Sequence, residues 1–496
     1  MSKSIWPKAP SGFVAAALSG HAALGLALGA LLYIVCLSGT LAVFYNEIER
    51  WEDPSVPEMS AMTPEAAGRT AANALAMLEE TPHHFGVRLP TPDMPRTVVF
   101  AEGRVLAADA EGVIVAEPRR AFETFLLNLH IYLHLPGVVG LTFVGFLGAH
   151  AGRPDHFRTA GASAIFRDAF TMRFGGSKRL GEADLHNRMS VWAAPFHLVI
   201  AVTGALIGLS SVLALFVAVL AYNGDVTKVF EPIFGPDQEM TDETPAPMAD
   251  IPAAYTNLKS AHPEVHPYYV SMHDPATKAQ TLSINALYPR RLAYSELYAF
   301  DVDGTLRGSQ GMVDGPVGRQ AFAASYTLHF GSFGGLPIRL AYGVLGVALC
   351  MVVATGLNIW FIKRRERGRP APRLQRSWTA VVWGAPASLS LSLLAAGLGV
   401  SGAGLIAVFW ASLALAIAWA VVAASNTLVS RALRLATGAL IALALTHYAV
   451  RYGEFLMTDA SIWTSLALLL AAIAFLVAPV RSLFVRRVAP SPAPAE

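Results

Sequence analysis

Four histidines recur at matched positions inside apolar stretches of the 496-residue chain: His21, His130, His186 and His329. A leucine precedes both His130 and His329, and a glycine follows both His21 and His186 after the same interval of 18 residues. The pattern indicates an internal duplication. Ionisable residues inside membrane helices are energetically costly and usually functional, so these histidines are the first candidates for chemistry.

Two histidines on facing helices can supply both axial ligands of a haem iron, and the core of a helical bundle is a usual place for such a site. Spans that alternate in direction place His21 and His186 near one membrane face, and His130 and His329 near the other. The duplication therefore predicts two haems of the b type, one at each depth. The two cysteines are isolated from each other, which argues against disulfides, thiolate metal sites and covalently attached c-type haem.

Two further histidines are alternative ligands. His134 lies one helical turn beyond His130, and His197 lies about three turns beyond His186, so either could replace its neighbour. A single histidine at a membrane boundary is more often an interfacial anchor, and only the fourfold recurrence favours ligation. We also expect the four matched histidines at the N-terminal ends of their spans, where the helix dipole keeps the imidazole neutral and able to bind iron.

The composition is that of a polytopic membrane protein, because 54% of the residues are hydrophobic and only 15% are charged. The expected fold class is mainly α, a polytopic membrane helical bundle of about eight spans. Eight apolar stretches are long enough to cross a bilayer: about 13–45, 129–150, 190–222, 336–362, 378–399, 403–424, 432–450 and 461–481.

Lysine and arginine cluster before or after alternate spans, which the positive-inside rule assigns to the cytoplasm. Both termini are then cytoplasmic, and the long first span is expected to be a permanent anchor rather than a cleaved signal peptide. The clusters comprise Lys3 and Lys8; Arg153, Arg158, Arg167, Arg173, Lys178 and Arg179; Lys363, Arg364, Arg365, Arg367 and Arg369; Arg431 and Arg434; and Arg481, Arg486 and Arg487.

Two long polar segments lie on the opposite side, and each predicts a small α+β module. Neither contains a nucleophile–base pair or a cysteine cluster, so both are expected to bind or to scaffold. The first has a helix at 63–80 and strands at 97–100, 105–108 and 113–115; the second has a helix at 251–260 and strands at 268–272, 281–286 and 297–302.

The chain is accordingly divided into six parts. They are the first span with its cytoplasmic N-terminus (1–45), the first outer module (46–125), spans two and three with a basic cytoplasmic loop (126–222), the second outer module (223–328), the fourth span with a basic exit (329–369), and four additional spans with a cytoplasmic tail (370–496).

The repeated order of histidine-led span, outer module and Leu-His span ends in Thr355-Gly356-Leu357-Asn358-Ile359-Trp360, followed by Lys363-Arg364-Arg365. This order resembles the PepSY-associated transmembrane helix proteins over roughly residues 10–367. The resemblance implies two periplasmic PepSY-like modules and location in a bacterial inner membrane. Residues 375–485 lie outside the resemblance.

The resemblance to iron-regulated, siderophore-reductase-like proteins also implies a function. Electrons would enter at the haem of His21 and His186, leave at the haem of His130 and His329, and reach a ferric siderophore, free or on a periplasmic siderophore-binding protein. The donor would be a quinol or a cytoplasmic reductase, and the only other expected partner is the lipid bilayer, with no nucleic acid. Two alternatives remain: a non-redox membrane anchor whose modules bind peptides or proteases or transmit a signal, and a siderophore permease.

Overall fold

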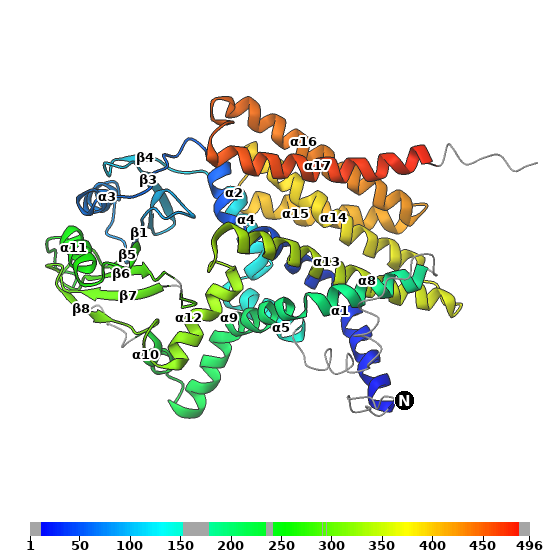
Figure 1. The fold of residues 1–496 in the computed structure, drawn as a ribbon, viewed down its shortest axis with the longest axis horizontal. Helices are drawn as coiled ribbons and strands as arrows, with labels where there is room; N and C mark the ends of the chain where they lie inside the picture. The colour runs from blue at the N-terminus through cyan, green and yellow to red at the C-terminus, as the bar shows by residue number, and fades with distance from the viewer. Residues whose placement is uncertain (1–10, 152–177, 235–241, 290, 294, 486–496) are drawn as a thin grey trace, which may run out of the picture.

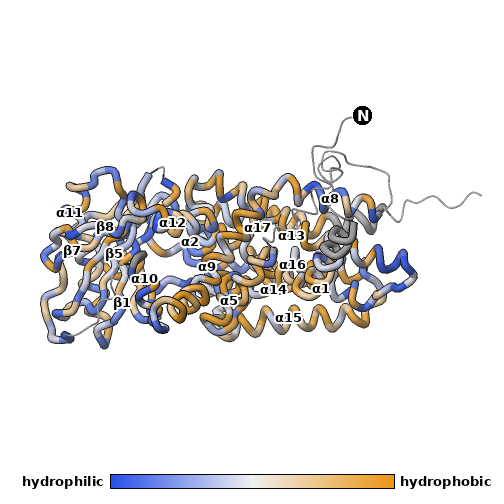
Figure 2. The backbone as a smooth tube through the Cα atoms, turned by 90° about the horizontal axis from the view of Figure 1, so that it is seen from below, coloured by the Kyte–Doolittle hydropathy of each residue, from blue (hydrophilic) through white to orange (hydrophobic). Residues whose placement is uncertain are grey.

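The computed structural model describes residues 11–151, 178–234, 242–289, 291–293 and 295–485, and it joins a long helical bundle to a β-sheet at one end (Figure 1). Within these residues, seven helices are long and apolar enough to cross a membrane, and a bent helix pair can form an eighth span. The expected class, a mainly helical polytopic bundle with a sheet region, is confirmed. Apolar residues dominate the bundle, whereas hydrophilic residues are common in the sheet (Figure 2).

The core of the bundle comes from the duplicated part of the chain. Its helices are α1 (Ser11–Ala42), α4 (Ala121–Tyr132), α5 (Gly137–Ala151), α8 (Lys178–Trp192), α9 (Ala194–Ala221), α12 (Val317–Phe330) and α13 (Gly335–Glu366), with the short helices α2 (Tyr45–Glu52) and α10 (Thr227–Phe234) beside them. Four further helices, which we call the annex, are α14 (Pro372–Gly397), α15 (Ala403–Val422), α16 (Asn426–Arg451) and α17 (Asp459–Val485), with the 3-10 turn Gly453–Phe455 between the last two.

The second predicted span is not one straight helix. It is the pair α4 and α5, which begins earlier than residue 129 and bends by 63°. Leu133 and His134 end α4 in the left-handed conformation, at φ 51° and 57°. Pro136 follows, and a proline lacks the amide hydrogen needed to continue the helical ladder.

The two modules form one antiparallel sheet of eight strands, in the order β4-β3-β2-β1-β5-β6-β7-β8. The helices α3 (Pro64–Ala76) and α11 (Ile251–Ala261) pack with it. The strands are β1 (His84–Arg88), β2 (Thr97–Ala101), β3 (Arg104–Ala108), β4 (Ile114–Ala116), β5 (His266–His273), β6 (Thr281–Leu287), β7 (Ser295–Phe300) and β8 (Leu306–Ser309).

The first strand of each module joins the two halves of the sheet. Val87 of β1 pairs with Val270 of β5 near the centre of the junction. Gly86 is needed here, because a Cβ at this position would lie 1.8 Å from the hydroxyl oxygen of Tyr269. The sequence analysis did not predict β1 or β8, and it did not indicate that the modules share a sheet.

Buried ion pairs attach the sheet to the bundle. Arg88 of β1 binds Glu49 of α2, whose side chain is 2% exposed. Arg120, just before α4, lies 3.2 Å from the same carboxylate, and Arg339 of α13 lies 2.9 Å from Asp93. The Arg88 pair holds β1 against α2, the Arg339 pair holds the loop after β1 against α13, and Arg120 ties the start of α4 to the same glutamate of α2. Removing one partner from the buried Glu49 pairs is costly.

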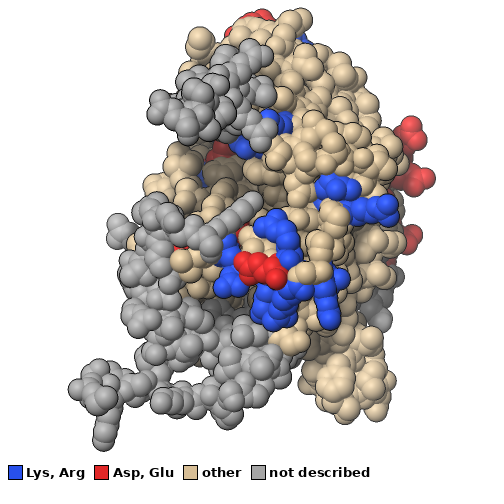
Figure 3. All heavy atoms as spheres, turned by 90° about the vertical axis from the view of Figure 1, so that its right-hand side faces the viewer, with Lys and Arg blue, Asp and Glu red and all other residues tan. Residues whose placement is uncertain are grey.

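The annex lies along one side of the core (Figure 1). Tyr33 of α1 donates a hydrogen bond to the carbonyl of Val382 in α14 (2.9 Å), and Trp51 of α2 stacks on Tyr448 of α16 with ring centroids 4.2 Å apart. We call the end of the bundle that carries the sheet the sheet end. The opposite end, where Lys and Arg gather around the exit of α13, is the basic end (Figure 3).

Candidate functional site: paired histidines at the sheet end

The structure brings His130 and His329 together. His130 comes from α4 and His329 from α12, and their rings lie 6.1 Å apart between centroids with an interplanar angle of 20°. Two imidazole nitrogens bonded to one metal at about 2 Å each would place the ring centroids about 6 Å apart. The spacing therefore suits two axial ligands of one iron, as the sequence predicted for this pair.

The hydrogen bonds of the two rings assign the proton to Nδ1. Nδ1 of His130 donates to the carbonyl of Val35 at 3.0 Å. Nδ1 of His329 lies 3.0 Å from Oγ1 of Thr203, whose own proton goes to the carbonyl of Val199 at 2.6 Å. Each ring is thus the tautomer that leaves the lone pair of Nε2 available, and a hydrogen bond at the other nitrogen is the usual way to orient a metal-binding histidine.

Glycines on the partner helices pack directly against these rings. A Cβ on Gly39 of α1 would lie 2.5 Å from Cε1 of His130, and one on Gly204 of α9 would lie 2.8 Å from Cε1 of His329. Contacts this short leave no room for a side chain. The spacing of these glycines marks them in the sequence, but it does not reveal that each one packs against a histidine from a later helix.

His186 repeats the arrangement toward the basic end. It lies in α8, and its Nδ1 donates to the carbonyl of Val352 at 3.0 Å, with Oγ1 of Thr355 at 3.2 Å. A Cβ on Gly356 would lie 3.2 Å from Cε1 of His186. The ring of His186 therefore packs against the Thr355-Gly356 part of the sequence motif.

His21 has different surroundings. It is exposed, and it lies in the N-terminal part of α1, which leaves the bundle in Figure 1. The predicted pairing of His21 with His186 stays a prediction. The basic residues Lys3 and Lys8 and those from Arg153 to Arg173 lie outside the described residues.

The two alternative ligands differ from each other. Trp410 of α15 donates to Nδ1 of His134 (3.3 Å), and Nε2 of His134 donates to the carbonyl of Phe125 (3.0 Å), so this ring has no lone pair left. His197 of α9 keeps a buried Nε2 without a hydrogen-bond partner in the described structure. These contacts favour His130 over His134 as a metal ligand, and the unpartnered Nε2 leaves His197 able to bind a metal.

The expected position at helix N-termini is wrong for His130 and His329, which lie in the last turns of α4 and α12, and for His186, which lies inside α8. His21 lies inside α1 but close to the start of its apolar span, Ser19–Ala42. The reason is that each Leu-His sequence ends a short helix before a break, at Leu133 in one repeat and at Gly331 in the other. The acceptors at Nδ1, and not the helix dipole, set the tautomers.

The electrostatics near α4 come from acidic groups on α2. Glu52 caps α4 by accepting hydrogen bonds from the amides of Phe122 (2.6 Å) and Glu123 (2.9 Å). Burial raises the pKa of Glu52 to about 7, although these amides oppose the rise. Burial also acts to raise the pKa of Glu49, but Arg88 and Arg120 outweigh it and hold that pKa below its usual value.

Among the described residues, no group of three or more His, Cys, Asp or Glu side chains is arranged to hold a metal ion. Two facing imidazoles can serve a metal whose remaining ligands come from another molecule.

Comparison with known proteins agrees with this architecture. The chain is 27% identical over 287 residues to the uncharacterized protein PA4219 of Pseudomonas aeruginosa, an alignment that covers 54% of this chain and 71% of the relative. The family described as the PepSY-associated TM region matches residues 18–363, which include both halves of the sheet and end within α13. The match spans most of the chain and confirms the resemblance seen in the sequence, so this protein belongs to the PepSY-associated TM region family.

Proposed function

We propose that this protein is a b-type haem electron-transfer protein of a bacterial inner membrane, which passes electrons to a periplasmic ferric siderophore and so favours release of the iron. The observation that carries the proposal is the His130 and His329 pair, with ring centroids 6.1 Å apart and both Nδ1 atoms engaged. When bound, a haem supplies reversible one-electron chemistry between its ferric and ferrous states.

The residues of this chain would hold and orient that group. His130 and His329 would hold the haem iron, Val35 and Thr203 would fix the tautomer of the two rings, and Gly39 and Gly204 would fix how closely the rings approach α1 and α9. His186 would serve a second haem nearer the basic end with His21 as its partner, and His197 is the alternative to His186. These roles rest on the donor chemistry of the described side chains.

The orientation of the protein follows from charge. Lys363, Arg364 and Arg365 close α13 at the basic end, and positive residues favour the cytoplasmic side of a membrane. The sheet, and with it the His130 and His329 pair, would then face the periplasm, with both chain termini in the cytoplasm. The electron donor would be a quinol or a cytoplasmic reductase.

The test begins with the absorption spectrum of the purified full chain. We expect extractable haem b and a low-spin, six-coordinate spectrum. His329→Ala should remove one haem and leave the other, while His134→Ala should leave both in place. A colourless preparation from haem-sufficient cells would contradict the haem assignment and favour a non-redox anchor or a permease.

The acceptor is tested separately. Dithionite-reduced protein should reoxidise when a ferric siderophore is added, faster than its anaerobic background, and His329→Ala should lose this step. If a panel of ferric hydroxamates, catecholates and carboxylates leaves the reduced spectrum unchanged, the reductase role is wrong even though the haem assignment stands.

A further inference from the structure

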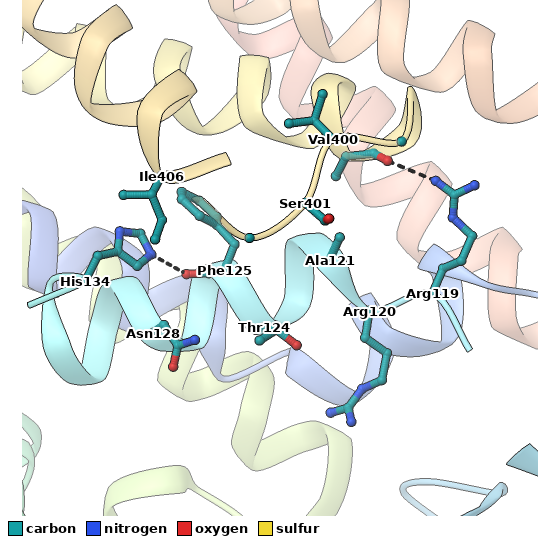
Figure 4. A pocket seen from close by; sticks show the side chains of 13 residues that line it. Arg119, Arg120, Ala121, Thr124, Phe125, Asn128, His134, Val400, Ser401 and Ile406 are labelled. Carbon is teal, nitrogen blue, oxygen red and sulfur yellow. Dashed lines mark hydrogen bonds between the residues drawn. The ribbon is translucent and has the colours of Figure 1, made fainter. Parts of the chain in front are cut away.

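A groove of about 620 Å³ runs along α4 at the sheet end, between this helix and the loop from α14 to α15 (Figure 4). Its volume falls in the range of small-molecule sites, about 300–1,000 Å³. The groove is amphiphilic, because Phe125 and Ile406 contribute apolar surface while Arg119, Thr124 and Ser401 contribute polar groups. It lies on a different face of α4 from His130, whose ring packs against α1.

The positive charge of Arg119 is not balanced by an acidic side chain in the lining of the groove. Arg119 donates to the carbonyls of Ala396 (3.0 Å) and Gly397 (3.4 Å), and it joins no ion pair among the described residues. Its neighbour Arg120, in contrast, lies 3.2 Å from Glu123. No acidic side chain lines the groove. The nearest carboxylates lie outside the groove: Asp53 accepts from the backbone amide of Arg119 (3.1 Å), and Glu52 lines the neighbouring small cavity. A guanidinium that forms no ion pair can still bind an anion, and phosphate is a preferred partner of arginine.

The groove lies at the level where the apolar spans end. α14 ends at Gly397 and α15 begins at Ala403, so the loop between them marks one boundary of the apolar band. The aromatic pair Trp51 and Tyr448 lies beside Arg119 around a neighbouring small cavity. Tryptophan and tyrosine are typical of the membrane interface, which is the level of phospholipid headgroups.

We propose that this groove binds one anionic phospholipid, with its phosphate beside Arg119 and Ser401 and the start of an acyl chain against Phe125 and Ile406. A guanidinium at the level of the headgroups can bind a lipid phosphate through charge-assisted hydrogen bonds. The lipid would join α4 of the core to the annex, next to the bond between His134 and Trp410. The proposal does not depend on the haem or on the acceptor.

Native mass spectrometry of the full chain, released from detergent with added phosphatidylglycerol, tests the proposal. We expect one lipid to remain bound, with about tenfold weaker retention in Arg119→Gln and partial recovery in Arg119→Lys. Ser401→Asp should weaken retention too, because it places a negative charge on an exposed loop residue without disturbing the bonds of Arg119.

Arg376→Gln is the matched control. Arg376 also donates to the last carbonyls of an annex helix, Ala420 (2.9 Å) and Val421 (2.8 Å) of α15, but it does not line the groove. Retention should be unchanged in this variant. Equal retention by wild type, Arg119→Gln and Ser401→Asp would overturn the proposal.

Two competitors identify the ligand. Phosphatidylethanolamine should be retained less than phosphatidylglycerol, and equal retention would overturn the requirement for an anion. Glycerol phosphate at the concentration of the lipid should not displace it. Displacement at that concentration would show that the groove binds a free anion, which would overturn the assignment to a lipid.

Discussion

The helices α4 and α12 carry the two duplicated Leu-His sequences, yet their surroundings differ. α4 is capped by Glu52 at its N-terminus and held by Trp410 of the annex, through His134, just beyond its C-terminus. α12 has no side-chain cap at its N-terminus, and Tyr326 and Phe330 beside His329 are 39% and 37% exposed. The helix of one histidine is therefore covered by protein and the helix of the other exposes aromatic side chains, although the two histidines themselves are both half-buried.

The contrast separates what both repeats need from what only one repeat has. Both place the histidine ring on a glycine of the preceding long span, Gly39 or Gly204. Only the first repeat is covered by the annex. The ring-on-glycine contact is thus common to both repeats, and the contact with the annex is specific to the first.

The largest expected effect comes from adding a side chain at the glycines that contact the histidine rings. Gly39→Ala and Gly204→Ala should each displace a histidine ring, because the added Cβ would lie 2.5 Å and 2.8 Å from the respective Cε1 atoms. We expect loss of the haem at this pair in absorption spectra and a loss of stability of about 1–3 kcal/mol. Gly25→Ala on α1 is the control, since nothing lies within 4 Å of its added Cβ. A Gly39→Ala spectrum identical to that of Gly25→Ala would contradict the requirement for glycine beside His130.

The next effect concerns Glu52, which has no counterpart on α12. Burial raises its pKa in the folded protein from 4.5 to about 7. The folded state therefore keeps the proton to a higher pH than the unfolded chain, and the contribution to stability, up to about 3 kcal/mol, is lost as the pH rises from about 4.5 to about 7. Thermal melts from pH 5 to pH 8 should show a smaller fall of Tm in Glu52→Gln than in wild type. Parallel pH profiles would mean that another group controls this range.

A smaller effect is expected at the bond from the annex. Trp410→Phe removes the donor to Nδ1 of His134 and should cost about 1 kcal/mol, measured as a decrease in Tm with haem content unchanged. The change should affect α4 alone, so hydrogen exchange should rise near Phe125 and His134 but not in α12. Equal rises in both helices would show that the annex stabilises the two repeats alike.

The smallest effect distinguishes how the two rings are held. Thr203 and the equivalent Ser38 both donate to carbonyls of their own helices, and Thr203 also accepts from Nδ1 of His329. Thr203→Ala should therefore shift the midpoint potential of the haem at this pair, and Ser38→Ala should shift it less. Spectroelectrochemical titration of the two variants measures the difference, and equal shifts would show that the Thr203 contact has no special role.

Local patterns in the sequence were enough to predict many elements. The helix of the second module was expected at 251–260 and is α11, Ile251–Ala261, because Asp250 caps it and an apolar face follows. The strand expected at 281–286 is β6, Thr281–Leu287, where buried and half-buried residues alternate. Seven of the eight expected spans are single long apolar helices, and the remaining one is the bent pair α4 and α5; a bilayer needs about 20 apolar residues.

By itself, the sequence determined the membrane class, the duplication and the histidines worth testing, because these depend on composition and on spacing along one chain. Only the tertiary structure decided that β1 pairs with β5, that α4 bends away from α5, and that His130 rests on Gly39. Each of these depends on residues far apart in the chain or on a local left-handed turn. Hydrophobic patterning carries no information about such contacts, since it records which face of a helix or strand is buried and not what covers it.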